Sequence, residues 1–397
     1  MKQDGIGFSE NAQQKYMALL RFAVLVFMCT SQIVIGHKLL RVCYYSSWSS
    51  QRNDGHALLP EDIDANLCTH INYAFITLDA SGTEIHTEQP YDLNLMKRLT
   101  GLKTKNPALK ILASLGGWEM GSMKFHEMVE SHANMNKFAQ NAIAFLRTHN
   151  FDGLDLDWEY PAARGSTAED KHAFSELLKV LHNAFDAEKQ RHHMTRLLLT
   201  AAVAASQWRT EQSYEVDMIS RYCDFMNLMT YDFHGSWENT TGPHSALYSD
   251  DTLSINYTAS YWEFHGAQKN KLMIGLPFYG NVFTLLNPFD NGVGAASFGG
   301  GDMPYYSICQ ILQHGRAQEI VLNKERVPYV VFGRKWVAYD NVNSLREKVD
   351  FVKKRGYGGI MVWAIDLDDT HGACGHKFPL MKSIVHRIKQ NGASDSG

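Results

Sequence analysis

The sequence predicts an α/β protein, a (β/α)8 TIM barrel with a small α+β insertion domain after its seventh strand. Eight short runs, most of them near-continuously apolar, are typical of parallel strands that are covered on both faces. Amphipathic segments with apolar residues at helical spacing lie between these runs. This alternation predicts a parallel sheet wrapped by helices, and 397 residues with 45% hydrophobic content supply a large core.

The expected strands, in chain order, are 39–46, 70–78, 110–117, 153–159, 197–204, 225–233, 272–280 and 358–367. The expected helices include 92–105, 135–149, 169–189 and 344–355. In the first of these helices, Leu93, Met96 and Leu99 keep the helical spacing. The connection 280–341 is too long for a βα loop and holds strand-like pieces, which predicts the insertion. The barrel is expected over 37–390, with a polar tail at 391–397.

Residues 1–36 are predicted to be a secretory signal peptide. An apolar core at 22–29 follows a positive residue, and Gly36 is a small residue at a plausible cleavage point. The polar stretch at the start makes Met17 a second candidate initiator. A retained signal anchor is the alternative, but polar residues at 30–32 interrupt the apolar run before the ~20 residues that a span needs. A secreted, extracellular protein with no stable membrane association is therefore expected.

Cysteine content fits the same compartment. After removal of such a signal, the remaining cysteines are Cys43, Cys68, Cys223, Cys309 and Cys374. A secretory route makes disulfides possible, and an odd number leaves at least one thiol free. Cys223, just before an apolar strand, is the best candidate for a buried free thiol, whereas spacing alone does not assign the pairing of the others. Two sequons, at Asn239 and Asn256, are candidate N-glycosylation sites.

Charge and histidine content limit the possible partners. The net charge of −4 argues against nucleic acid, because proteins that bind it usually carry a basic stripe. The 18 histidines are scattered, so no metal site is expected, and no cofactor is predicted. A monomer is expected.

A cluster of acids lies in the segment FDGLDLDWEYP, residues 151–161. Asp155, Asp157 and Glu159 occupy every second position, so all three are expected on one face of the fourth strand. Clustered carboxylates drive their pKa values apart, as general acid chemistry requires. A solvated edge strand is the alternative, but the residues between the acids are large and apolar. The segment therefore predicts a proton donor.

Aromatic residues gather at the carboxyl ends of the predicted strands, where function collects in a barrel of this type. Trp48, Trp118 and Trp363 lie at the ends of the first, third and eighth strands. Sugar rings present C–H faces to indoles and hydroxyl groups to polar neighbours, so aromatic faces around acids indicate a carbohydrate site. Any one of these tryptophans could equally pack in the core, but their shared position favours a role in binding.

The segment DGLDLDWEYP resembles the DxxDxDxE signature of glycoside hydrolase family 18, the chitinases and chitinase-like lectins. The resemblance to animal secreted chitinases extends over nearly all of the mature chain, through VCYYSSW, CTHINYAF, LASLGGW, LMTYDFHGSW, LPFYG and MVWAIDLDD. It implies an endo-type chitinase that cleaves β-1,4 linkages between N-acetylglucosamine units of chitin or chito-oligosaccharides. A non-catalytic chitin-binding lectin and an endo-β-N-acetylglucosaminidase are the alternatives. The intact acids favour the enzyme, and the aromatic residues favour chitin.

The resemblance implies roles for the catalytic residues. Glu159 matches the general acid, and Asp157 matches the acid that turns toward it and toward the substrate's acetamido group. Asp155 matches the buried partner that shares a proton with Asp157, and Tyr231 matches the tyrosine that hydrogen-bonds the acetamido carbonyl. Family 18 uses the substrate's 2-acetamido oxygen as the nucleophile and retains the anomeric configuration. The acids alone do not distinguish this mechanism from a retaining one with Asp157 as the nucleophile.

Further residues match the walls, floor and platforms of the family's cleft: Tyr44, Trp48, Phe75, Gly116, Gly117, Trp118, Met229, Asp232, Tyr279, Met361 and Trp363. Among them, Trp363 matches the floor of the subsite where the sugar distorts. The resemblance also implies two disulfides, Cys43 with Cys68 and Cys309 with Cys374.

The chain departs from the family pattern at Asn281, where animal chitinases usually carry Arg. Asn cannot replace the planar fork of donors of Arg, so a different substrate affinity or subsite preference is expected. The segment 292–306 looks shorter than in relatives, which predicts a lower cleft wall. No cysteine-rich chitin-binding module follows the barrel, so weak binding to crystalline chitin is expected.

Overall fold

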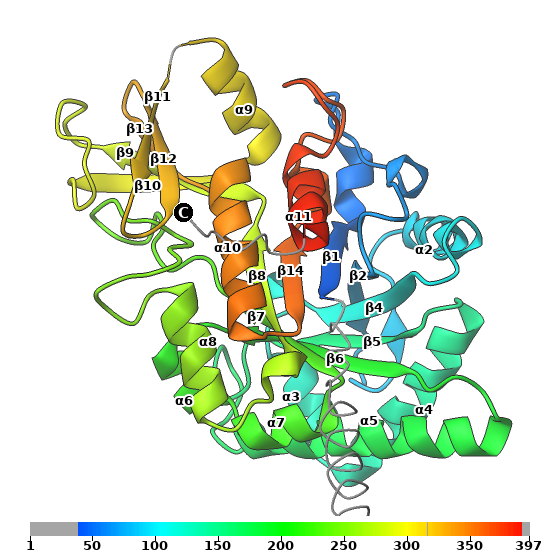
Figure 1. Cartoon of the computed structure of the whole chain (residues 1–397). Coiled ribbons are helices and arrows are strands. Elements are labelled where there is room, and N and C mark those ends of the chain that lie inside the picture. Colours follow the sequence, from blue (N-terminus) through cyan, green and yellow to red (C-terminus); the bar gives the residue numbers. More distant parts are fainter. Residues whose placement is uncertain (1–38, 316, 391–397) are drawn as a thin grey trace, which may run out of the picture. The chain divides into compact units, whose positions relative to one another are not determined.

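Eight parallel strands close into a barrel (Figure 1). The computed structural model describes residues 39–315 and 317–390, so the predicted signal at 1–36 and the tail at 391–397 lie outside the described residues. The barrel strands are β1 (Leu40–Ser46), β2 (His70–Leu78), β4 (Lys110–Gly116), β5 (Gly153–Asp157), β6 (Leu198–Ala204), β7 (Phe225–Met229), β8 (Leu272–Pro277) and β14 (Gly359–Trp363). They pair in the order β1-β14-β8-β7-β6-β5-β4-β2, and β1 also pairs with β2, which closes the ring. The short β3 (Ile85–His86) pairs antiparallel with β2. The predicted barrel is confirmed.

Helices surround the ring of strands. They are α2 (Asp92–Thr100), α3 (Met123–Val129), α4 (His132–Thr148), α5 (Asp170–His192), α6 (Gln207–Ser213), α7 (Val216–Tyr222), α8 (Ile255–Phe264), α10 (Val342–Arg355) and α11 (Pro379–Lys389). Short 3-10 turns are η1 (Ser47–Gln51), η2 (Pro60–Asp62), η3 (Gly101–Thr104), η4 (Trp118–Met120), η5 (Lys269–Lys271) and η6 (Ile365–Leu367). The predicted C-terminal end of the helix at 92–105 is wrong, because the α-helix stops at Thr100 and a 3-10 turn begins at Gly101. Glycine is a poor helix former, which favours this tightening.

Two apolar layers hold the barrel. One lies between the strands and the helices and includes Leu156, Leu199, Ile274 and Val362, which are fully buried. The other fills the inside of the ring: Val42, Tyr44, Ala74, Phe225, Met273, Met361 and Ala364. The alternation of strand side chains produces both layers, since successive residues point to opposite faces.

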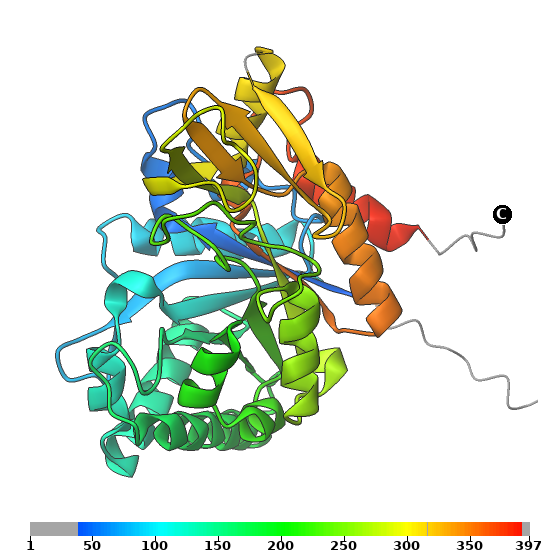
Figure 2. The same ribbon diagram turned by 90° about the vertical axis from the view of Figure 1, so that its left-hand side faces the viewer.

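A second sheet forms between β8 and β14. Its strands are β9 (Tyr279–Leu285), β10 (Ser297–Pro304), β11 (Gln318–Leu322), β12 (Val327–Phe332) and β13 (Lys335–Ala338), and α9 (Tyr305–Gln313) follows β10. The sheet is antiparallel, in the order β10-β9-β13-β12-β11. Figures 1 and 2 show it on the opposite side of the barrel from α4 and α5. This sheet is the predicted α+β insertion, and β9 begins two residues after β8 ends.

The cysteines pair as the resemblance implied. Cys43 bonds Cys68, and Cys309 bonds Cys374. Cys223 is free and buried, and burial raises the pKa of its thiol. Within the described residues, no helix combines the length and apolar content needed to cross a membrane.

A buried ion pair joins the second sheet to the barrel. Asp340 follows β13, and its Oδ2 lies 2.5 Å from the Nζ of Lys348 on α10, with no solvent exposure of either side chain. Ser344 Oγ donates to the other carboxylate oxygen at 2.6 Å, and Ser245 Oγ, from the β7–α8 loop, donates to Oδ2 at 2.6 Å. Burial lowers the pKa of Lys348, and the charge of Asp340 opposes this shift. The cluster thus holds three segments together.

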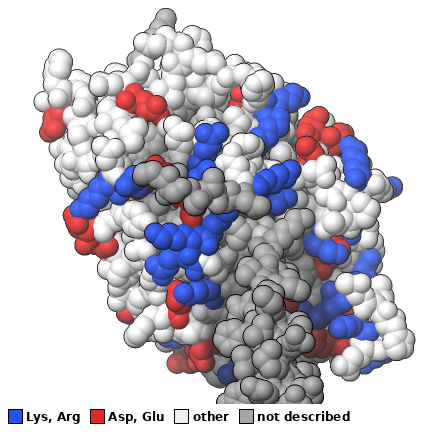
Figure 3. Space-filling model, in the orientation of Figure 1, with Lys and Arg blue, Asp and Glu red and all other residues white. Residues whose placement is uncertain are grey.

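Exposed charges near α10 and α11 are mixed in sign. Figure 3 shows Lys and Arg over the face that carries these helices, with Asp and Glu beside them. Arg355 lies 3.4 Å from Glu263, and Arg387 lies 2.5 Å from Asp350. The positive charge of these arginines is therefore compensated locally.

Candidate functional site

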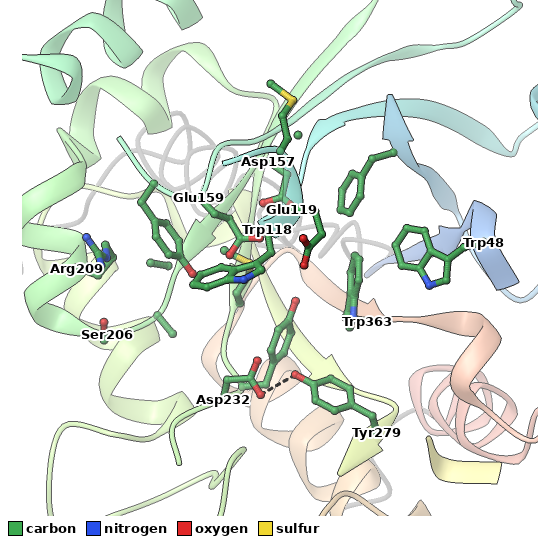
Figure 4. Close-up of a pocket in the computed structure, with 18 of the residues that line it drawn as sticks. Trp48, Trp118, Glu119, Asp157, Glu159, Ser206, Arg209, Asp232, Tyr279 and Trp363 are labelled. Carbon is green, nitrogen blue, oxygen red and sulfur yellow. Dashed lines mark hydrogen bonds between the residues drawn. The ribbon is translucent and has the colours of Figure 1, made fainter. Parts of the chain in front are cut away.

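A cavity of about 980 Å³ opens at the carboxyl ends of the barrel strands. Its lining includes acids, aromatic side chains and one arginine: Trp48, Phe75, Trp118, Glu119, Asp157, Glu159, Tyr160, Trp208, Arg209, Met229, Tyr231, Asp232, Trp237, Tyr279 and Trp363. Figure 4 shows Glu159 and Asp157 near its centre, with Trp48 and Trp363 to one side and Arg209 to the other. Aromatic walls with a few converging polar groups are what a sugar site requires.

The prediction that all three acids lie on one strand is wrong for Glu159, because β5 ends before it. β5 ends at Asp157, which pairs with Gly116 of β4, and Gly117 N–H donates to the Asp157 carbonyl. Beyond this point β5 has no pairing partner. The alternation nevertheless continues. Trp158 turns outward and packs parallel to Phe125, with ring centroids 4.9 Å apart, while Glu159 lines the cavity.

Asp155 lies beneath the cavity and is fully buried. Tyr44 OH and Ser114 Oγ donate to its Oδ2 at 2.6 and 2.7 Å. Thr200 Oγ1 and Asn227 Nδ2 donate to its Oδ1 at 2.6 and 3.2 Å. Burial raises the pKa of Asp155, and these donors oppose the rise because they stabilise the carboxylate. Both oxygens are thus held in place.

Asp157 faces the cavity and has a free acceptor. It is 3% exposed, and its Oδ1 has no hydrogen-bond partner among the described residues. Burial raises its pKa well above the usual range, and the charges of Glu159 and Asp155 add to this shift. An unsatisfied buried oxygen at a cavity wall is suited to a polar group of a ligand.

Glu159 has the properties of a proton donor. Burial raises its pKa to about 7, and the charge of Asp232 contributes in the same direction. A hydrogen bond with Tyr160 and the charge of Arg164 oppose the shift. A carboxyl group that titrates near neutrality can both donate and accept a proton at physiological pH.

Asp232 forms the opposite wall with residues of the second sheet. Tyr279 OH and Asn281 Nδ2, both on β9, donate to its Oδ1 at 2.8 and 2.9 Å (Figure 4 draws the Tyr279 contact). The Asp232 side chain is 45% exposed, so only part of it is desolvated. This desolvation acts to raise the pKa of Asp232, but His244, Tyr279 and Asn281 together lower it below its ordinary value. Asn281 also donates to the His234 carbonyl at 2.9 Å and is 5% exposed. The departure at this position therefore lies behind Asp232, where it fixes an acid of the wall.

Aromatic rings form the floor and one side. The ring of Trp363 lies parallel to Phe75, with centroids 5.7 Å apart, and tilted against Tyr44 at 5.3 Å. Trp48 contacts both Phe75 and Trp363, at 6.1 and 6.4 Å, and is 45% exposed. Trp118 is 55% exposed, with the Arg164 guanidinium carbon 3.6 Å from its ring centroid. These rings are available to stack on sugars.

Two glycines allow the β4 end to approach its neighbours. A Cβ on Gly116 would lie 2.2 Å from the carbonyl oxygen of Asp157, and one on Gly117 would lie 2.4 Å from the Phe75 ring. Both have positive φ, 116° and 83°. Gly116 lines the cavity, whereas Gly117 does not appear in its lining. Their demonstrated role is close packing.

The cavity brings together most of the residues predicted from the sequence. The exceptions are Asp155, Tyr44 and Met361, which are fully buried below its surface, and Gly117. Tyr44 and Met361 therefore support the floor of the cavity from below. Neither is placed to contact a substrate directly. Two tryptophans without a role predicted from the sequence, Trp208 and Trp237, also line the cavity and are 61% and 65% exposed. Their signal was a tryptophan within a polar segment shortly after a strand.

The remaining candidate sites are more peripheral. Asn239 is exposed in a loop, whereas Asn256 lies on α8, where the hydroxyl of its sequon residue Thr258 is buried and donates to the Ala205 carbonyl. Among the described residues, one group has metal-ligand character: Cys309, Cys374 and Asp369. Its two sulfurs form a disulfide, and the carboxylate accepts backbone N–H groups from 372–374, so these atoms are already engaged.

Comparisons with known proteins agree with this geometry. The family model described as "Glycosyl hydrolases family 18" matches residues 41–368. "Putative chitinase 1" of Margaritifera margaritifera is 42% identical over 94% of this chain and 80% of its own, and "Chitotriosidase-1" of Mus musculus is 40% identical over 87% and 77%. The structure of an immunomodulatory active chitinase from Trichuris suis, TsES1, has a TM-score of 0.84 at 34% identity, over 88% of this chain and all of that one. Human YKL-39, described as a pseudo-chitinase with retained chitooligosaccharide binding, has a TM-score of 0.83 at 36% identity, over 89% of this chain and all of that one.

Proposed function

The chain belongs to glycosyl hydrolase family 18, and from this premise we propose that it is a secreted chitinase that hydrolyses β-1,4 linkages between N-acetylglucosamine units with retention. One observation carries the proposal. Glu159, with a pKa of about 7, lies in an aromatic-walled cavity beside Asp157, whose Oδ1 is unpartnered among the described residues. A proton donor and a free acceptor lie together where a sugar can stack.

In the first step, the sugar before the scissile bond stacks on Trp363. Glu159 protonates the glycosidic oxygen, and the 2-acetamido oxygen of this sugar attacks the anomeric carbon as the leaving chain departs. Asp157 Oδ1 accepts the acetamido N–H, and Tyr231 OH donates to the acetamido oxygen. The developing oxazolinium charge is stabilised by the carboxylates beneath it.

In the second step, ionised Glu159 takes a proton from water, and the water opens the oxazolinium ion from the face that the leaving chain vacated. Two inversions give net retention. Asp155 acts by position and charge: its hydrogen-bonded oxygens keep a negative group below Asp157, which raises the pKa of Asp157. Asp232 orients the opposite wall through Tyr279 and Asn281.

The proposal also covers secretion and the mode of cleavage. The two disulfides support an oxidising compartment, and the signal peptide predicted at 1–36 would direct the chain to such a compartment. The cavity has aromatic side chains on both sides of Glu159, from Trp48 to Trp208, which supports binding across the interior of a chain. Endo-type cleavage follows from this arrangement, and a monomer is part of the same proposal.

Hydrolysis of N-acetylchitohexaose distinguishes an enzyme from a lectin. The pseudo-chitinase among the similar structures is an example of the lectin alternative. We expect shorter oligomers, and NMR during the first turnovers is expected to show the new reducing ends as the β-anomer. Saturable binding with no product would support a lectin. An α-anomer at early times would exclude the retaining mechanism, and release of N-glycans from a glycoprotein in place of chitin products would favour the endo-β-N-acetylglucosaminidase.

The pH profile is a second prediction. Hydrolysis needs protonated Glu159, and its pKa is raised to about 7, so kcat/KM is expected to fall as pH rises through that value, by about tenfold per pH unit beyond it. Initial rates between pH 4 and 10, with far-UV circular dichroism at each pH as a control for folding, measure this. A fall that begins near the ordinary carboxyl value of about 4.3 would contradict the assignment.

A further inference from the structure

The first turn of α6 presents a tryptophan and an arginine to the cavity. Trp208 and Arg209 follow β6 closely, both line the cavity, and Trp208 is 61% exposed. Neither contributes to the acid cluster at Glu159 or to the aromatic group around Trp363. Trp208 is one of four exposed tryptophans that line the cavity, and a group of exposed apolar side chains around one cavity marks a binding surface.

Arg209 is held in a defined position against aromatic rings. Its guanidinium carbon lies 4.2 Å from the centroid of the Trp208 ring and 4.9 Å from that of Tyr160. Its Nη1 donates to Gln212 Oε1 at 2.8 Å, and Gln212 Nε2 donates to the Ala162 carbonyl at 2.8 Å. Among the described residues, Arg209 forms no ion pair. Its charge is therefore retained at the wall, and the indole beside it is preorganised.

The barrel topology places this turn across the cavity from Trp48, one of the platforms predicted from the sequence. In the closed ring, β6 is four strands from β1 in either direction. Trp48 follows β1, Trp208 follows β6, and Glu159 follows β5. Figure 4 shows Arg209 and Trp48 on opposite sides of Glu159. A chain that crosses the cavity over Glu159 reaches both rims.

We propose that Trp208 and Arg209 form a binding subsite for an N-acetylglucosamine unit on the leaving-group side of the scissile bond, filled by long oligosaccharides. The proposal rests on the proposed function, which places the sugar before that bond on Trp363. Indole faces pack on the C–H face of a pyranose, and guanidinium N–H groups donate to hydroxyl or acetamido oxygens. The cation also disfavours a deacetylated, positively charged unit at this position.

Binding measurements test this subsite independently of turnover. In a Glu159→Gln background, calorimetric titration with N-acetylchitohexaose and N-acetylchitobiose is compared with and without Trp208→Ala. We expect about tenfold weaker binding of the hexasaccharide and less than about twofold for the disaccharide, which occupies the inner subsites. Phe264→Ala is the matched control, because Phe264 is an exposed ring on α8 that does not line the cavity.

Product analysis adds a second measurement in the active protein. Trp208→Ala is expected to shift the positions at which the hexasaccharide is cut, and Arg209→Met is expected to raise the relative rate on partially deacetylated chains. Equal losses of affinity for both ligand lengths, or no loss for either, would overturn the subsite. If the wild-type chain binds the hexasaccharide through Trp208 but releases no product, the catalytic proposal fails, and Trp208 and Arg209 stand as a sugar-binding position without a leaving-group side.

Discussion

Replacing Glu159 with Gln is expected to lower kcat on chito-oligosaccharides by about 10²–10⁴-fold, the usual contribution of a general acid–base group. Gln keeps the shape of the side chain but cannot donate a proton to the glycosidic oxygen. The change also removes a carboxyl that repels Asp157, so folding is expected to persist and oligosaccharide binding is expected to remain measurable. Steady-state rates on a fluorogenic chitotriose and calorimetric binding of the hexasaccharide separate the two effects.

Glu84→Gln, at an exposed position in the β2–β3 hairpin, is the matched control and is expected to behave as the wild type. An unchanged kcat in Glu159→Gln would refute the assignment of the proton donor. Loss of binding together with turnover would instead indicate a damaged site.

Replacing Lys348 with Met is expected to destabilise the protein by about 3–5 kcal/mol, because it leaves the Asp340 carboxylate buried without its counterion. The hydrogen bonds from Ser245 and Ser344 remain, so the carboxylate is only partly compensated. Urea unfolding followed by far-UV circular dichroism measures the loss. Lys354→Met, at an exposed position of the same helix, is the matched control.

Adding Asp340→Asn to Lys348→Met removes the orphaned charge. The double variant is therefore expected to be less destabilised than the sum of the single variants, which is the signature of direct coupling. A loss of less than about 1 kcal/mol in Lys348→Met would show that this pair behaves like a surface ion pair.

Most of the architecture could be predicted from the sequence because burial imposes it. The eight strands are covered on both faces, so their apolar runs mark them clearly. Their ends were less predictable: β5 and β7 stop at Asp157 and Met229, where neighbouring strands no longer offer partners. Strand pairing is a property of two segments, and the pattern of one segment does not contain it.

The candidate site could be predicted as far as the alternation of side chains along a strand decides which way each residue points. This alternation placed Asp155, Asp157 and Glu159 on the inner side of the barrel. It did not give the depth of these residues along the barrel axis. Tyr44 and Met361 point inward as expected and lie too deep to line the cavity. Depth depends on the stagger between strands, which no single segment encodes.

Contacts between residues far apart in the sequence could not be predicted either, because they depend on how two segments are placed relative to each other. The pair of donors that Tyr279 and Asn281 offer to Asp232 spans nearly fifty positions and two sheets. The polar surroundings of Trp208, QWRTEQ, are typical of an ordinary surface helix and do not predict a binding role. Only the three-dimensional position of that turn at the cavity makes the indole informative.

The hydrogen bonds of Asp232 also bear on how this family can diversify. Asp232 follows a barrel strand, whereas its two donors belong to the second sheet, so one carboxylate both shapes the cavity wall and connects the barrel to the second sheet. Mutations selected there for a new ligand preference therefore carry a folding cost that other changes must offset. Mutations in the exposed turn at Trp208 are expected to have a smaller folding cost. Changes in ligand preference are therefore expected to accumulate sooner at the α6 rim than at the β9 wall.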